Sequence, residues 1–246
     1  MHTPPLESSI EWGYWPAMER AGLIPSPIQN PDEYDGAEIV NLCCTQTGLS
    51  PSKQRALVRS WCQLLPETSI TTLVFRSRVS QPLFEAALRI RSLSALFVKW
   101  GGLTDLEPCL GHPGLTSLYI GSSPSLTGLG HLTSVTQLTH LFLNDVRQAS
   151  QLEYVYGLNK LLEFGLGGRS LRVRVASLEP IAALQNLATL WLVNVSAADK
   201  SLEHLYALRS LRSFRTDRDP DSREIVSMCE AIPTLQYLRP VWGGYK

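Results

Sequence analysis

The stretch Leu187-Ala188-Thr189-Leu190-Trp191-Leu192-Val193-Asn194-Val195 decides the fold, because it follows the pattern L-x-x-L-x-L. Four clear copies of this pattern begin at Leu93, Leu115, Leu138 and Leu161, and weaker copies begin at Ile70, Leu211 and Leu235. From Ile70 to Leu235, the first residues of successive copies lie 23, 22, 23, 23, 26, 24 and 24 residues apart. Self-similarity at such a period is typical of a stacked repeat array.

A second apolar pattern follows the clear copies, with apolar residues three positions apart, as in Leu126-x-x-Leu129-x-x-Leu132. This spacing suits a short helix or 3₁₀ turn, whereas the L-x-x-L-x-L copies suit strands. No single repeat can bury its apolar face alone, so neighbouring repeats must stack. The sequence therefore predicts an α/β right-handed solenoid. Its parallel sheet lines the concave face, and short helices or 3₁₀ turns line the convex face.

The chain resembles leucine-rich repeat proteins, of the short-repeat type seen in bacterial internalins, most clearly over residues 93–215. This resemblance implies the solenoid fold and a role in binding other proteins. One feature departs from the family, because the asparagine that usually follows each strand is missing. The corresponding positions are Gly101, Ser123, Val146, Arg169 and Val195. We therefore expect turns that differ from those of the family.

We divide the chain into four parts. Residues 1–38 are rich in proline and carry Trp12, Tyr14 and Trp15, so we expect an irregular cap that packs its aromatics on the open end of the solenoid. A docking arm for a partner is the alternative. Residues 39–92 are degenerate repeats with longer helices, one of them beginning after Ser50, a good N-cap. Residues 93–215 are regular repeats, and residues 216–246 form a C-terminal cap repeat.

The repeat that begins at Leu161 is the longest, and its extra residues lie between Gly167 and Val175. Apolar residues alternate with arginines in this segment, which predicts a protruding loop or a small extra strand. Its three arginines (Arg169, Arg172 and Arg174) either bind an acidic partner or simply form a solvated face.

Composition excludes several classes of protein. Lys+Arg and Asp+Glu are equal at 22 each, whereas a nucleic-acid-binding protein needs a basic surface. No apolar run is long enough to span a bilayer, and residues 1–22 do not have the pattern of a secretory signal. The five cysteines are scattered without zinc spacing. We therefore expect a cytoplasmic monomer that contacts neither nucleic acid nor membrane.

The candidate site lies on the concave face, because residues between the leucines of each strand point outward. Adjacent strands lie about 4.8 Å apart, so Phe97, Tyr119 and Phe142 should form a ladder of rings across three strands. Polar residues flank this ladder, and an apolar centre with a polar rim is the usual anatomy of a protein-binding patch. The predicted partner-binding residues are Phe97, Lys99, Tyr119, His140, Phe142, Asn144, Glu163, Gly165, Trp191 and Arg215.

These aromatics also have two purely structural interpretations, and both stay open. Aromatic residues favour strands for reasons unrelated to binding, and the N-terminal aromatic segment could fold back over them. If the face is a binding surface, Gly165 and Gly167 should leave a notch about 10 Å wide between Phe142 and Trp191. A partner side chain or loop would enter this notch.

No catalytic motif accompanies the repeats. The histidines lie in no metal-binding spacing, and the patterns of hydrolases, phosphate loops and dinucleotide sites do not occur. His140 and Glu163 fall on adjacent strands, where a structural pair is the better interpretation. We expect no enzyme, no metal and no cofactor. The predicted function is a non-enzymatic module that binds another protein. Small solitary arrays of this kind resemble immunity proteins that neutralise a cognate toxin, and the alternative is an adaptor or scaffold.

Overall fold

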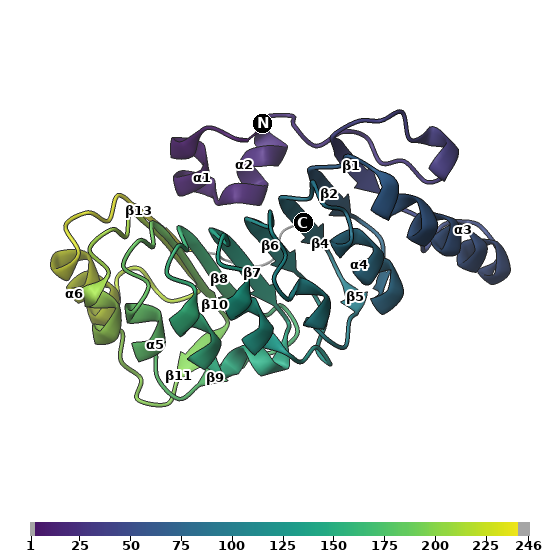
Figure 1. Ribbon diagram of the computed structural model, residues 1–246. Coiled ribbons are helices and arrows are strands. Elements are labelled where there is room, and N and C mark those ends of the chain that lie inside the picture. Colours follow the sequence, from purple (N-terminus) through teal and green to yellow (C-terminus); the bar gives the residue numbers. More distant parts are fainter. Residues whose placement is uncertain (1–2, 241–246) are drawn as a thin grey trace.

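The repeats form a parallel sheet in the computed structural model, which describes residues 3–240. Nine strands follow the order β1-β2-β4-β6-β7-β8-β10-β12-β13 (Figure 1). Strands of consecutive repeats are neighbours, and most helices lie on one side of the sheet, opposite α1 and α2 (Figure 1). The predicted leucine-rich repeat solenoid is thereby confirmed. Among the described helices, none is long and apolar enough to cross a bilayer.

The bounds of the elements follow the repeat pattern. The strands of the large sheet are β1 (Ile39–Leu42), β2 (Thr72–Phe75), β4 (Ala95–Val98), β6 (Ser117–Ile120), β7 (His140–Asn144), β8 (Glu163–Gly167), β10 (Thr189–Val193), β12 (Ser213–Thr216) and β13 (Tyr237–Pro240). Two small sheets pair β3 (Val79–Ser80) with β5 (Gly101–Gly102) and β9 (Val173–Val175) with β11 (Val195–Ala197). The α-helices are α1 (Leu6–Trp12), α2 (Tyr14–Arg20), α3 (Pro51–Leu64), α4 (Gln81–Leu88), α5 (Glu179–Ala182) and α6 (Arg223–Ala231). The 3₁₀ helices are η1 (Pro31–Glu33), η2 (Leu65–Glu67), η3 (Glu107–Cys109), η4 (Leu129–Ser134), η5 (Arg147–Ser150), η6 (Leu152–Gly157) and η7 (Glu203–Ala207).

The core lies between the large sheet and the outer helices. Leu118, Leu141 and Leu190 face inward from three strands, and each is at most 1% exposed. Equivalent leucines lie side by side, because Leu118 pairs with Leu141 in the register of β6 and β7. The core is therefore a continuous stack of apolar layers, as the repeat period predicts.

A ladder of hydroxyl groups joins the starts of the strands. The hydroxyl of Ser94 donates to the carbonyl of Thr71 (2.9 Å), that of Thr116 to Ser94 (3.0 Å), and that of Thr139 to Thr116 (3.0 Å). Each of these residues therefore satisfies a backbone carbonyl of the preceding repeat, which helps to fix the register of neighbouring strands.

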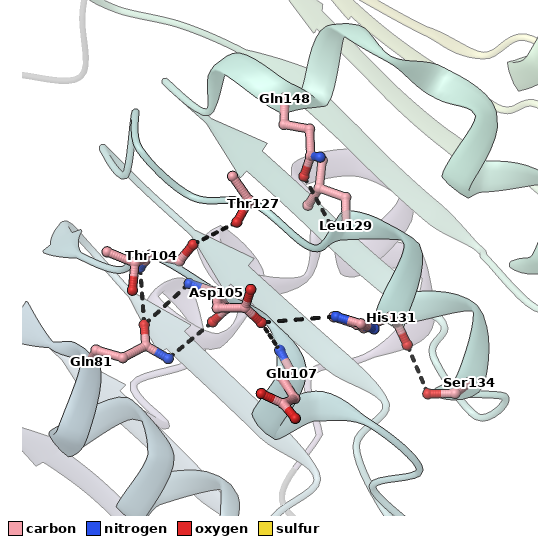
Figure 2. Close-up of polar contacts among 9 residues, drawn as sticks. All are labelled: Gln81, Thr104, Asp105, Glu107, Thr127, Leu129, His131, Ser134 and Gln148. Atoms are coloured by element: carbon pink, nitrogen blue, oxygen red, sulfur yellow. Dashed lines mark hydrogen bonds and ion pairs between the residues drawn. The ribbon is translucent and has the colours of Figure 1, made fainter.

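Side-chain amides perform a similar role on the outer side (Figure 2). The Gln81 side chain accepts from the amide of Thr104 (3.0 Å) and donates to the carbonyl of Asp105 (3.1 Å). Three repeats further along the chain, Gln148 accepts from the amide of Leu129 (3.1 Å). The convex turns are thus held together by side chains that reach from one repeat to another.

The turns after β7 and β10 correct the expectation of missing asparagines. Asn194 and Asp145 directly follow these strands, one residue before the predicted positions Val195 and Val146, and both have positive φ (58° and 53°). The Asn194 amide donates to the carbonyls of Gly168 (3.2 Å) and Leu171 (3.3 Å). Asn and Asp tolerate this left-handed conformation better than other residues, so these two turns do have the polar residue that the repeat needs.

Other local predictions agree with the structure. The Ser50 side chain caps α3 by accepting from the amide of Lys53, and the extra residues after β8 form the short strand β9, parallel to β11.

The N-terminal segment differs from the predicted irregular cap. Residues 6–20 form the helices α1 and α2, which lie across the concave face and not on the open end of the solenoid (Figure 1). The short polypeptide after them does reach that end, because Ile28 forms a parallel bridge with Leu42 at the edge of β1. We call α1 and α2 with the intervening Gly13 the N-terminal hairpin.

Candidate functional site on the concave face

Four aromatic rings form one wall on the concave face. Phe97 stacks on Tyr119 with ring centroids 4.3 Å apart, and Tyr119 stacks on Phe142 at 4.9 Å. Trp191 then meets Phe142 edge-on at 5.4 Å. The first three residues are directly paired across β4, β6 and β7, so the predicted ladder is confirmed.

The predicted notch at Gly165 is filled. A Cβ atom on Gly165 would overlap the ring of Phe142, because the missing side chain lets that ring lie down on β8. The same tilt brings Phe142 to Trp191. The notch hypothesis is therefore wrong, and Gly165 completes the aromatic wall instead of interrupting it.

The N-terminal hairpin packs on this wall. The ring of Trp15 meets Phe97 at 5.2 Å, and the ring of Tyr14 meets His140 at 4.6 Å. The amide of Tyr14 donates to the Glu163 carboxylate (2.7 Å). Since this amide opens α2, the carboxylate of a strand caps the helix. The fold-back that the sequence left open is thus present.

Gly13 allows the hairpin to lie close to Glu163 and Trp191. Its φ is +84°, which glycine adopts easily, and a Cβ atom there would lie 2.7 Å from Glu163 Oε1 and from Trp191 Cζ2. The chain therefore turns between the two helices directly above the buried carboxylate.

Burial changes the ionisation of the groups beneath the hairpin. Burial raises the pKa of Glu163 to about 7, although the Tyr14 amide and the nearby Arg215 act in the opposite direction. Burial also lowers the pKa of His140 to about 4. The predicted pair of these two side chains is not among the hydrogen bonds of residues 3–240, because Glu163 bonds to Tyr14 while His140 Nδ1 lies 2.9 Å from the hydroxyl of Thr139.

Ion pairs hold both ends of the hairpin. Glu19 pairs with Arg76 beside β2, and Glu11 pairs with Arg239 in β13. Glu7 accepts two hydrogen bonds from Arg212 (2.8 and 3.0 Å). The hairpin contributes the carboxylates and the solenoid contributes the guanidinium groups.

The predicted partner-binding residues fall into two sets. Glu163, Gly165, Trp191 and Arg215 are buried, whereas Lys99 is exposed and Phe97, Tyr119, His140, Phe142 and Asn144 are half-buried. We leave out His140, which packs under Tyr14, and define the open wall as Phe97, Lys99, Tyr119, Phe142 and Asn144. The hairpin cluster also touches Phe97 and Tyr119, but both keep part of their surface exposed. The predicted site did not include Trp12, Tyr14 and Trp15. The signal for them was present, because the sequence carries these three large aromatics within four residues.

The arginine-rich loop, which carries Arg169, Arg172 and Arg174, is hydrogen-bonded to a buried aspartate. Asp145 is 3% exposed and accepts from the amides of Ser170 (2.9 Å) and Leu171 (2.8 Å). The three arginines of this loop are exposed, and none has an ion-pair partner among residues 3–240. Within the same range, no group of three or more His, Cys, Asp or Glu residues is arranged to hold a metal ion.

Comparisons with known proteins give similarities in structure. No family model matches the chain, and no curated protein matches its sequence. The solved structure of an internalin (InlF) from Listeria monocytogenes aligns with a TM-score of 0.53 at 21% identity, over 74% of this chain and 53% of that one. The alignment therefore spans about half the length of InlF. Internalin C2 of the same organism aligns with a TM-score of 0.48 at 18% identity, over 75% of this chain and 92% of that one. The chain therefore has a leucine-rich repeat solenoid fold like that of InlF.

Proposed function

We propose that the protein is a non-enzymatic module that binds another protein through the open wall. The observation that carries this proposal is the stack of Phe97, Tyr119 and Phe142, whose rings share one face and are only half-buried. Aromatic side chains grouped on a surface mark interaction sites more often than chance. Lys99 and Asn144 supply the polar edge that such a patch usually has.

The partner that we favour is a single protein that this chain binds tightly, as an immunity protein binds its toxin. A few aromatic residues then carry most of the binding free energy. The alternative is an adaptor with several weaker partners. The five cysteines are unpaired, which supports a reducing, cytoplasmic compartment.

Site-specific photo-crosslinking in the native cell tests the proposal. A photoreactive amino acid at position 99 lies at the edge of the open wall, and the same amino acid at Tyr156, which is 47% exposed on the outer side, is the matched control. We expect position 99 to cross-link to protein and position 156 not to do so. Equal cross-linking at both positions, or none at position 99, would contradict the open wall as a binding site. A single cross-linked protein supports the toxin-type partner, and several support the adaptor.

A further inference from the structure

The N-terminal hairpin has its own small apolar cluster. Tyr14, Trp15 and Met18 pack on Val74 and Ala95, and this cluster is separate from the leucine core of the solenoid. The hairpin can therefore leave the concave face without opening that core. Such small, separate clusters belong to the regions that open most readily in native proteins.

The chain leaves the hairpin at Gly22. Gly22 has φ +66° and no atom near the position that a Cβ would take, and residues 21 and 22 are exposed. The amides of Gly22 and Leu23 bond back to α2 (3.0 Å each). A rotation that carries α1 and α2 away as one unit therefore takes place between Leu23 and Ile28, and Ile28 remains bonded at the edge of β1.

When the hairpin lies on the concave face, some buried polar groups lack hydrogen-bond partners. The hydroxyls of Ser117 and Ser213 point outward from β6 and β12, are buried, and have no hydrogen-bond partner among residues 3–240. Glu163 is a carboxyl group held away from water beneath the hairpin, where the Tyr14 amide is its hydrogen-bond donor. Buried polar groups without partners favour states in which water or a ligand reaches them. The polar groups beneath the hairpin therefore favour its release from the concave face.

The covered surface has a definite chemistry. Arg76 lies at one end and Arg212 and Arg239 lie at the other. Between them lie the rings that the hairpin contacts, those of Phe97, His140 and Trp191. Each of these arginines pairs with a carboxylate of the hairpin. An occupant of this surface needs carboxylates near both ends and aromatic side chains between them.

Building on the proposed function, we infer that the hairpin occupies, within the same chain, a binding site for a helical segment of the partner. When the hairpin swings out, a partner segment with acidic ends and aromatic residues between them takes its place. The binding surface then extends from the open wall to Glu163, Trp191 and Arg215.

Hydrogen exchange of the full chain tests whether the hairpin opens by itself. We expect the amides of α1 and α2 to exchange at least tenfold faster than those of β7 and β8, under conditions in which the solenoid stays folded. If the hairpin amides exchange only at the rate of the central strands, the hairpin is a permanent part of the fold and the inference is wrong.

A peptide with the sequence of residues 3–22 tests the chemistry of the occupant. In the full chain, the combined substitutions Glu7→Gln, Glu11→Gln and Glu19→Gln weaken the chain's own hairpin. We expect this variant to bind the peptide at least tenfold more tightly than the unsubstituted chain does, and to bind poorly a peptide with the same three changes. The matched control replaces three exposed glutamates elsewhere, Glu67, Glu107 and Glu153, by glutamine.

Equal peptide binding by the variant and the control, or none by either, would overturn the inference. Neither measurement depends on cross-linking at position 99. A failure of the proposed function is therefore distinguishable from a failure of the hairpin inference.

Discussion

Gly165 shows how one missing side chain arranges a surface. The Phe142 ring occupies the space above this glycine, so we predict that Gly165→Ala forces the ring to move. Such overpacking typically costs about 1–3 kcal/mol. Urea unfolding should show this loss, while Gly130→Ala should be nearly neutral, because no atom lies within 4 Å of that Cβ position. Equal stability of the two variants would mean that Phe142 adapts without cost.

Glu163 gives a prediction about pH. Burial raises its pKa in the folded protein to about 7, from an ordinary value of 4.5. A raised pKa of an acid means that its contribution to stability is fully present below pH 4.5 and is lost as the pH rises through 7. Glu163→Gln cannot ionise and keeps an acceptor for the Tyr14 amide. We therefore expect the variant to be more stable than the unsubstituted protein at pH 8, by on the order of 2–3 kcal/mol, and similar to it at pH 4.5.

Denaturant unfolding at the two pH values measures this difference. His140, whose pKa burial lowers to about 4, becomes charged on unfolding below its ordinary pKa of 6.5. This charging weakens the fold as the pH falls. Because it does so in both proteins, its effect cancels in the comparison. A stability difference that is the same at pH 4.5 and pH 8 would show that Glu163 does not carry the predicted ionisation.

The residues that line the wall were predictable, and a fold-back of the N-terminal aromatics over them was an open alternative, but the contacts of this cover were not predictable. Outward positions follow from the alternation of side chains along a strand, and this alternation placed Phe97, Tyr119, Phe142 and Trp191 together. The bond between Tyr14 and Glu163 joins residues 149 positions apart, and no repeat period relates them. The filled notch at Gly165 depends on the tilt of one ring, which a sequence pattern does not specify.

The turn after β7 is an element whose stability depends on one side chain. Asp145 accepts from two backbone amides of the arginine-rich loop. We predict that Asp145→Ala, which leaves both amides unpaired, costs about 1–3 kcal/mol and accelerates amide exchange over residues 168–175. Asp145→Asn retains one acceptor and tolerates the left-handed conformation, so its effect should be smaller. If both variants exchange like the unsubstituted protein, another contact holds the loop.

Helices α1 and α2 show the limit of prediction at the scale of elements. Each has seven residues, which is too short for a clear helical period and marginal without tertiary contacts. The prolines suggested irregular structure, yet Pro5 precedes α1, and Pro16 lies in the first turn of α2, where proline is tolerated. Packing on the aromatic wall stabilises these two helices.

The whole molecule combines a solenoid with an N-terminal hairpin. The repeated sequence pattern specifies the solenoid, whereas individual contacts specify where the hairpin lies. Each layer of leucines is buried by the layers on either side, so an inner layer has two neighbours and an end layer has fewer. Leu141 of β7 is 1% exposed and lies in the middle of the stack. Leu238 of β13 is only partly buried against the same core.

Position along the stack should therefore decide the cost of losing a leucine. We predict that Leu141→Ala costs about 2–5 kcal/mol, through lost burial and the cavity left behind, and that Leu238→Ala costs about 1 kcal/mol. Urea unfolding followed by tryptophan fluorescence gives both values, because the six tryptophans of the chain report its unfolding. Similar costs at the two positions would show that the solenoid unfolds without regard to layer position. A larger cost at Leu141 would locate the stability of the chain in its central repeats, directly behind the open wall.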